Sequence, residues 1–196
     1  MKLIQPQKII LASKSPRRKE LLEQLGLTIA IVPSDIDEKS VLIKDPGTYV
    51  QKLSGLKAKN IALLYPDDWV IGADTIVVVD DQVLGKPISN ADAFGMLNRL
   101  NDRSHSVFTG FSIINQEKKI IVTQSIETTV CFKNLTQREI QWYVNTGEPF
   151  DKAGSYAIQG IGSFLVKHIS GSHSNVVGLP VCEVFEVLIN LNIIQI

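Results

Sequence analysis

Four positively charged side chains lie close together near the N-terminus, where a short apolar run leads into a helix. They are Lys14, Arg17, Arg18 and Lys19, and no acidic residue occurs among them before Glu20. Like charges at this spacing repel one another unless an anion lies between them. Guanidinium groups and the free amides of a helix start both suit a phosphate group. The stretch therefore indicates a phosphate-binding site, with an ordinary solvated basic corner as the alternative.

Two elements position these cations. Residues 9–12 are a short apolar run typical of a buried strand. Ser15 and Pro16 are a typical cap and first residue of a helix, and Gly26 is a typical end. Acidic residues usually occupy the first helical turn, at the positive end of the helix dipole. Arginines at this position are therefore a second indication of an anionic ligand.

Asp74 is the most unusual acidic residue of the chain. It lies inside the apolar stretch 69–79, directly after Gly72 and Ala73. A carboxylate in such a strand is costly unless it is paired, hydrogen-bonded or bound to a metal. The small residues before it leave room for a ligand near the backbone. We therefore favour a functional role for Asp74 over a purely structural one.

Other polar residues are ambiguous when each is taken alone. Glu38 ends an acidic segment, 35–38, that suits either a metal-binding edge or a simple turn. Lys57 lies on a predicted helix, where a solvated charge is the usual finding. Lys86 stands between a glycine and a proline without the spacing of a Walker motif. His105 could act as a base or be a hydrogen-bonded structural residue.

Composition limits the classes of function. The chain has 196 residues, with twenty basic and twenty acidic side chains. This balance argues against a general nucleic-acid binder. We expect one domain over residues 1–196, and neither a secretory signal nor a membrane span, hence a cytoplasmic protein. Cys131 and Cys182 lack metal-ligand spacing, so we predict that both are reduced core residues.

The remaining elements follow from periodicity and turn signals. We predict helices over 45–64, 90–100, 136–144 and 181–191, and strands over 28–33, 69–79, 102–114 and 120–132. Residues 147–180 are rich in glycine, and Glu148 and Gln159 are the polar candidates there. This segment lacks the third glycine of a dinucleotide-binding motif.

Motifs spread along nearly the whole chain resemble the Maf family. In chain order they are residues 10–13 with 15–18 and 20–22, Asp37–Glu38, Lys57–Ala58, Gly72–Thr75, Gly85–Pro87, His105–Val107 with Thr109–Gly110, Lys152–Gly154, Ile158–Gly160 and Gly178–Pro180. The resemblance implies a nucleoside triphosphate pyrophosphatase that cleaves between the α and β phosphates with a divalent metal. It also implies an α/β fold like that of the inosine triphosphatases: an elongated, mixed, mostly antiparallel sheet flanked by helices, two lobes around a central cleft, and a homodimer.

The resemblance also assigns site residues. The Ala-Asp-Thr sequence around Asp74 is similar to the branch that acts on dTTP and UTP, in which Asp74 is the proton acceptor. Arg17, Thr75 and Gln159 then match the residues that set base specificity. The other polar positions of the family's site are Ser13, Arg18, Glu38, Lys57 and Lys86.

A mechanism follows as a hypothesis. Glu38 and Asp74 hold Mg²⁺ or Mn²⁺ against the phosphates, and Asp74 positions the attacking water. We assign Arg18 to the phosphates and Arg17 to the rim near the base, since adjacent helical residues diverge. Lys14 and Lys19 are then solvated charges.

One difficulty concerns the neighbours Asp74 and Thr75. Adjacent side chains on a regular strand face opposite sides, so both can reach one site only if the strand bends or bulges near Gly72. We predict such an irregularity, and a regular strand would count against contact of Thr75 with the base.

Rival functions stay open from sequence. The protein could act on 7-methyl-GTP or on a non-canonical purine triphosphate, or it could be a nucleotide-binding regulator of septum formation with little turnover. A generic phosphatase is a further alternative. An acid set beside a cation set favours catalysis, because binding alone does not need Asp74 in an apolar strand.

Overall fold

The computed structural model describes residues 3–38, 41 and 45–196. Its strands are β1 (Ile9–Leu11), β2 (Ile29–Ile31), β3 (Trp69–Val79), β4 (Gln82–Leu84), β5 (Ser104–Asn115), β6 (Ile120–Phe132) and β7 (Val166–Ser170). Its helices are α1 (Pro16–Gln24), α2 (Pro46–Ala62), α3 (Asn90–Leu100), α4 (Gln137–Asn145), α5 (His173–Val177) and α6 (Val181–Asn190). Short 3₁₀ turns occur at Glu148–Asp151, Ala153–Ser155 and Gly160–Leu165.

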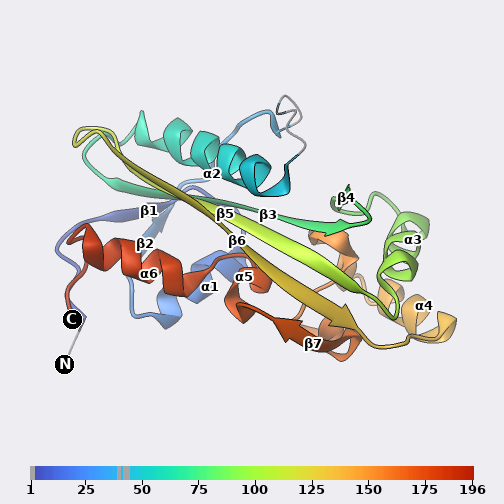
Figure 1. The fold of residues 1–196 in the computed structure, drawn as a ribbon. Coiled ribbons are helices and arrows are strands. Elements are labelled where there is room, and N and C mark those ends of the chain that lie inside the picture. Colours follow the sequence, from blue (N-terminus) through green and yellow to red (C-terminus); the bar gives the residue numbers. More distant parts are fainter. Residues whose placement is uncertain (1–2, 39–40, 42–44) are drawn as a thin grey trace. The chain divides into compact units, whose positions relative to one another are not determined.

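The strands form one mixed, seven-stranded sheet. Its order is β2-β1-β3-β5-β6-β7, and β4 pairs with β3 (Figure 1). Strand β1 is parallel to both β2 and β3, so Leu11 lies opposite Ile31 on one side and Ile71 on the other. The β3–β4 and β6–β7 pairs are antiparallel. The predicted α/β class, with a mixed sheet flanked by helices, is confirmed.

The chain divides into two compact units. The first consists of Met1–Asp74, Thr109–Ile126 and Gly178–Ile196, and the second of Thr75–Phe108 and Glu127–Val177. Strands β3, β5 and β6 contribute residues to both. The predicted single domain with a cleft between two lobes stays a prediction.

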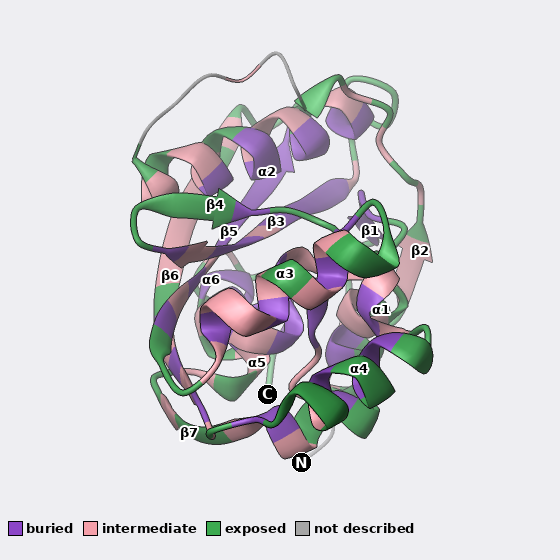
Figure 2. Ribbon diagram, turned by 90° about the vertical axis from the view of Figure 1, so that its right-hand side faces the viewer, coloured by how far each residue is buried: buried purple, intermediate pink, exposed green. Residues whose placement is uncertain are grey.

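Helix α2 covers the strands of the first unit. Its buried side, which includes Ala58, Ile61 and Ala62, packs with Ile10 of β1 and Val70 of β3. Figure 2 shows the buried residues of α2 on the side that faces the strands. Apolar side chains at spacings of three and four residues bring one stripe of the helix into the core, and their burial stabilises the unit.

The starts of the first unit's helices agree with the sequence. Ser15 occupies the N-cap position of α1 without a side-chain hydrogen bond to the helix, Pro16 is the first helical residue, and Gly26 follows the helix with a φ of +82°. At α2 the Asp45 side chain accepts a hydrogen bond from the Thr48 amide at 2.7 Å. These local signals confirm both predicted starts, because each depends only on residues within one turn.

Strand β3 extends from Trp69 to Val79, and the predicted bend near Gly72 stays a prediction. The packing of α2 gives a separate reason for glycine at this position. A Cβ atom at position 72 would lie 2.4 Å from the Ser54 carbonyl oxygen and 2.7 Å from the Ala58 amide nitrogen of α2. Gly72 therefore allows the helix backbone to approach the strand closely.

The second unit has its own core. Leu97 and Leu100 of α3, Ile140 and Tyr143 of α4, and Phe132 of β6 are among its buried residues. Helix α4 begins with a capping box, in which the Thr136 hydroxyl accepts from the Glu139 amide and Glu139 accepts from the Thr136 amide. Asp80 and Asp81 form a two-residue turn between β3 and β4, both with positive φ.

Other expectations need correction. Cys182 is exposed and Cys131 is only partly buried, so neither is a core residue, although both are free thiols. Residues 166–170, which we did not predict as a strand, pair with β6 as β7. Their burial pattern has no apolar alternation that would have indicated a strand. Within the described residues, no helix is both long and apolar enough to cross a membrane.

Candidate active site

Lys57 joins the two predicted carboxylates. Its ammonium nitrogen lies 2.7 Å from an oxygen of Asp74 and 2.8 Å from an oxygen of Glu38. Lys57 comes from α2, Asp74 from β3, and Glu38 from the segment after β2. Asp74 and Lys57 are 8% and 9% exposed, whereas Glu38 is exposed. The packing of α2 against β3 thus places this lysine inside the site instead of in solvent.

Arg18 holds a second group of predicted residues together. Its Nε donates to the carbonyl oxygen of Gly178 at 2.8 Å, and its Nη1 donates to the Ser13 hydroxyl at 3.1 Å and to the Ala73 carbonyl at 2.9 Å. Ala73 directly precedes Asp74. Arg18 therefore fixes the backbone beside Asp74, in addition to the phosphate contact that we predict for it.

The electrostatics of this group favour an anion. Burial is the main cause that lowers the pKa of Arg18, and Asp74 is the main charge that opposes this shift. The first turn of α1 carries Arg17 and Arg18 and no acidic residue. Arg17 is partly buried, whereas Lys14 and Lys19 are exposed, as expected for solvated charges. Arginine side chains and helix amides can donate to the same phosphate.

The donor chemistry of Glu38 and Asp74 fits a hard divalent cation. Both carboxylates contact the same lysine nitrogen, so they converge on one point. In the part of the chain that the structure describes, no group of three or more His, Cys, Asp or Glu side chains is arranged to bind a metal. Mg²⁺ is often held by one or two carboxylates, with water and substrate phosphates as the other ligands. Two carboxylates would suffice for such a metal.

Three predicted substrate residues belong to the second unit. Thr75, next to Asp74 on β3, and Gln159, before the turn at Gly160–Leu165, are partly buried, and Lys86 is exposed after β4. The loop that carries Lys86 is tied down, because the Gly85 carbonyl accepts from the Gly154 amide at 3.0 Å. The structure therefore groups Ser13, Arg18, Glu38, Lys57 and Asp74 within the first unit, and it places Thr75, Lys86 and Gln159 in the other.

His105 is structural. It is buried, and its Nε2 lies 2.7 Å from the Tyr156 hydroxyl. Its ring stacks edge-on against Phe132 and Tyr156. Burial lowers its pKa to about 4, so the ring is neutral near pH 7. Of the two sequence readings, the structural one fits these contacts.

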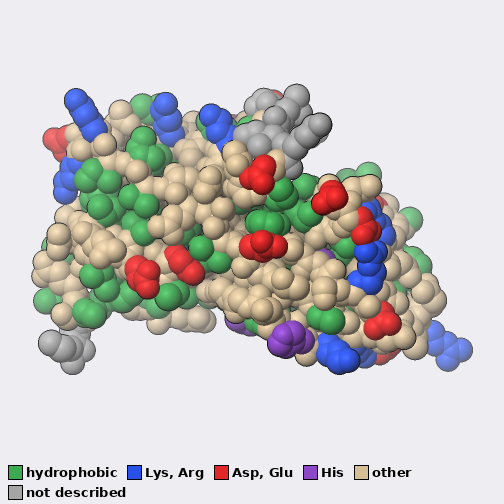
Figure 3. Space-filling view, in the orientation of Figure 1, with side chains coloured by type: hydrophobic (Ala, Val, Ile, Leu, Met, Phe, Trp, Pro, Cys, Tyr) green, Lys and Arg blue, Asp and Glu red, His purple; other side chains and the backbone are tan. Residues whose placement is uncertain are grey.

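Charge is dispersed on the face shown in Figure 3. Lysine and arginine side chains stand there singly or in small groups, with acidic and neutral residues between them. Local clusters such as the one around Arg18 therefore carry more functional information than the net charge of zero.

Comparisons with known proteins agree with these observations. The model of the family described as "Maf-like protein" matches residues 8–191. The chain is 50% identical over 182 residues to the dTTP/UTP pyrophosphatase of Syntrophus aciditrophicus (strain SB). The aligned region covers 93% of this chain and 89% of that protein. It is 47% identical over 188 residues to the dTTP/UTP pyrophosphatase of Desulfotalea psychrophila, with 96% of both chains covered.

A solved structure shares the fold. The HAM1 protein from Coxiella burnetii aligns with a TM-score of 0.55 and 17% identity, over 94% of this chain and 99% of that one. At this identity the likeness shows the architecture alone. The family match over residues 8–191, with relatives near half identity over almost their full length, establishes that the chain belongs to the Maf-like protein family.

Proposed function

We propose that this protein is a nucleoside triphosphate pyrophosphatase that hydrolyses dTTP and UTP to the nucleoside monophosphate and pyrophosphate. The observation that carries the proposal is the cluster of Lys57 with Asp74 and Glu38, in a chain that is 50% identical to a relative named dTTP/UTP pyrophosphatase. A buried carboxylate, a second carboxylate and a buried cation suit phosphoryl chemistry better than simple binding.

The cations of the first unit would bind the phosphates. A triphosphate carries close to four negative charges, and the amides of the α1 start, Arg17, Arg18 and Lys57 can contribute donors to it. Ser13, whose hydroxyl accepts from Arg18, can donate its own proton to a phosphate oxygen. In the second unit, Lys86 is the proposed phosphate ligand, because it lies exposed on a loop fixed at Gly85.

Glu38 and Asp74 would hold the divalent metal, Mg²⁺ or Mn²⁺. When bound, such an ion supplies positive charge that stabilises the phosphates and the leaving pyrophosphate. The Lys57 ammonium contacts both carboxylates, so it would share them with a metal held at this position. An ammonium group has three N–H donors, so the same group could also donate to a phosphate oxygen.

Asp74 is the proposed proton acceptor. Its carboxylate is buried, and one oxygen, Oδ1, accepts from Lys57. The other oxygen is then the one to orient a water molecule and take its proton. Arg18, through the Ala73 carbonyl, fixes the backbone that carries this carboxylate.

Recognition of the pyrimidine base is assigned to Arg17, Thr75 and Gln159. Direct contact of Thr75 with the base, at a site shared with Asp74, requires a bend in β3, because neighbouring residues on a regular strand face opposite sides. Gln159 is the stronger candidate, since a side-chain amide offers both a donor and an acceptor to a uracil or thymine edge. Its own side chain caps no helix amide.

Assembly and location are proposals from family membership. We propose a homodimer that works in the cytoplasm on free nucleotides and not on nucleic acid. Multi-angle light scattering of the purified chain tests the dimer, and a monomer at micromolar concentration would overturn it.

The substrate test is a panel of nucleotides incubated with Mg²⁺ or Mn²⁺, with identification of the products. Monophosphate and pyrophosphate from UTP and dTTP support the proposal. A preference for 7-methyl-GTP or for a non-canonical purine triphosphate would correct the substrate. Diphosphate plus phosphate would indicate a generic phosphatase, and binding without turnover would favour a nucleotide-binding regulator of septation.

A further inference from the structure

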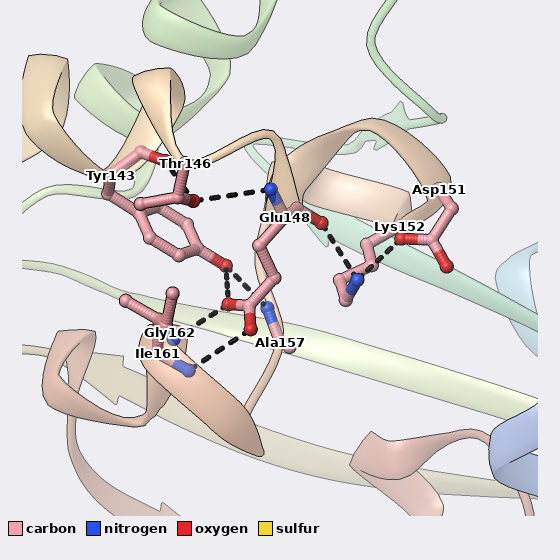
Figure 4. Close-up of polar contacts among 8 residues, drawn as sticks. All are labelled: Tyr143, Thr146, Glu148, Asp151, Lys152, Ala157, Ile161 and Gly162. Carbon is pink, nitrogen blue, oxygen red and sulfur yellow. Dashed lines mark hydrogen bonds and ion pairs between the residues drawn. The ribbon is translucent and has the colours of Figure 1, made fainter.

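The carboxylate of Glu148 accepts hydrogen bonds from helix α4 and from the 3₁₀ turn that follows Gln159. Its Oε1 accepts from the Ile161 amide at 3.0 Å, and its Oε2 accepts from the Gly162 amide at 2.8 Å and from the Tyr143 hydroxyl at 2.7 Å. Figure 4 shows these groups converging on the carboxylate. The two amides belong to the 3₁₀ turn at Gly160–Leu165, directly after Gln159.

Tyr143 holds the same segment from the other side of Gln159. Its hydroxyl accepts from the Ala157 amide at 3.2 Å while it donates to Glu148 (Figure 4). Burial, together with the bond to Glu148, raises the pKa of Tyr143, so the hydroxyl keeps its proton. Gln159 therefore lies between two anchored stretches of backbone: Ala157 on one side, and Ile161 with Gly162 on the other.

The fit around these bonds leaves no room for larger residues. Gly160 has a φ of +66°, and a Cβ atom there would lie 2.4 Å from Oε1 of Glu148. A Cβ atom at Gly162 would lie 2.5 Å from both the Tyr143 hydroxyl oxygen and the Ala157 carbonyl oxygen. Both glycines thus allow the turn to close onto Glu148 and Tyr143.

Glu148 is itself attached to a rigid support. It follows Gly147, whose φ is +79° and which ends helix α4. Its amide donates to the Thr146 hydroxyl, and its carbonyl accepts from the Lys152 ammonium at 2.7 Å (Figure 4). Tyr143 lies on the buried face of the same helix. Hydrogen bonds therefore attach the backbone on both sides of Gln159 to α4 and to the core of the second unit.

We propose that Glu148 and Tyr143 are positioning residues for Gln159, and that through it they set the selectivity for a pyrimidine base. The proposal rests on the proposed function, in which Gln159 recognises the base. A side-chain amide discriminates between bases only if its donor and acceptor are held in a fixed place, because a mobile amide can adapt to several partners. Glu148 and Tyr143 supply that constraint without touching the nucleotide.

The decisive variant is Glu148→Gln. It keeps the size of the side chain but removes the charge, and it turns an amino group toward backbone amides that are themselves donors. Loss of a charge-assisted hydrogen bond within the protein shifts the equilibrium between the ordered and the disordered turn by roughly tenfold or more. Nucleotide binding that requires the ordered turn weakens by a similar factor. We expect the KM values for UTP and dTTP to rise about tenfold with kcat changed less than about threefold, as for a loss of uniform binding. The kcat/KM for GTP should stay unchanged, so selectivity falls about tenfold.

Two further measurements keep the proposal testable whatever the substrate turns out to be. Amide hydrogen exchange of Ile161 and Gly162 should accelerate in Glu148→Gln, and that of Ala157 should accelerate in Tyr143→Phe. Tyr143→Phe should shift selectivity in the same direction, by a smaller factor. It serves as the test of selectivity if Glu148→Gln fails to fold.

Glu139→Gln is the matched control. Glu139 also accepts hydrogen bonds at a helix start, in the capping box of α4, but it does not hold the Gln159 turn. This variant should lower the melting temperature without changing selectivity. If Glu148→Gln or Tyr143→Phe behaves in the same way, with wild-type selectivity and unchanged exchange, the positioning role is overturned. If the wild-type protein releases no pyrophosphate from UTP or dTTP, the proposed function is wrong. The hydrogen-exchange data then still test whether Glu148 and Tyr143 hold the backbone around Gln159.

Discussion

The ammonium of Lys57 lies 2.7 Å from the carboxylate of Asp74, and both side chains are about nine-tenths buried. A second carboxylate, Glu38, contacts the same ammonium from the more exposed side. One cation thus contacts two acids at the place where the reaction is proposed to occur, and the three groups together keep one negative charge. This relationship predicts how the site responds when either partner is changed.

Lys57→Met should destabilise the protein and abolish turnover. It leaves Asp74 buried without its cation, and breaking a buried ion pair in this way costs about 3 kcal/mol or more. A divalent metal can replace the missing positive charge, so Mg²⁺ or Mn²⁺ should raise the melting temperature of the variant more than that of the wild type. Denaturant unfolding and thermal melts at several metal concentrations measure both effects.

The control for this variant is Lys59→Met, which removes an exposed lysine from the same helix. It should change neither the stability nor the response to metal appreciably. Equal metal responses of Lys57→Met and the wild type would contradict the proposed metal position between Glu38 and Asp74.

Asp74→Asn should abolish turnover while nucleotide binding stays largely intact. The amide keeps the size of the side chain but cannot accept a proton from water. Pyrophosphate release measures turnover, and calorimetric titration with UTP measures binding. Asp81→Asn is a suitable control, because Asp81 is exposed in the β3–β4 turn with a φ of +57°, a conformation that Asn tolerates. Near-normal turnover of Asp74→Asn would rule out its role as proton acceptor.

Stability should fall as the pH is lowered from about 6.5 to about 4, partly because of His105. Burial lowers its pKa from 6.5 in the unfolded chain to about 4 in the folded protein. Between these values the unfolded state binds the extra proton, so the stabilisation is complete above pH 6.5 and is lost as the pH falls to 4. The full effect is up to about 3 kcal/mol. Denaturant unfolding at pH 7, 5.5 and 4 measures it.

The contribution of His105 can be isolated by substitution. His105→Gln should flatten the pH dependence of stability between pH 6.5 and 4, whereas His168→Gln, at an exposed position on β7, should leave it unchanged. An unchanged pH dependence in His105→Gln would show that the buried ring does not titrate as stated.

Gly72→Ala should destabilise the first unit strongly, because its Cβ would meet backbone atoms of α2 that cannot move independently. Overpacking of this kind costs about 1–3 kcal/mol. Gly95→Ala is the comparison variant, because a Cβ on this residue of α3 meets nothing within 4 Å. Its free energy of unfolding should rise by about 0.5–1 kcal/mol. Denaturant unfolding compares the two. A stable Gly72→Ala protein would refute the close helix approach.

The elements with strong local signals could be predicted from sequence. Ser15 with Pro16, Asp45, and the pair of Thr136 with Glu139 begin their helices as expected. Asp45 and Thr136 each accept a hydrogen bond from an amide within their own turn, and Pro16 fixes its backbone in a helical conformation. Strand β7 could not be predicted, because its stability comes from pairing with β6, which lies more than thirty residues earlier in the chain. The exposure of Cys182 likewise depends on which side of α6 packs inward.

The sequence by itself determined the types of chemical group: the cations at the start of α1, an acid within an apolar strand, and the motifs of the Maf-like family. Only the tertiary structure decided which of these groups meet. Lys57 looks like a solvated charge along α2, and it becomes a partner of Asp74 because glycine at position 72 lets that helix pack closely on β3. Glu148 was a polar candidate of the glycine-rich segment, but its role was decided by the fold, since its partners at Tyr143, Ile161 and Gly162 come together only when the turn folds back onto α4. Side-chain chemistry is a property of the residue, whereas burial and proximity arise from contacts between residues that are distant in the chain.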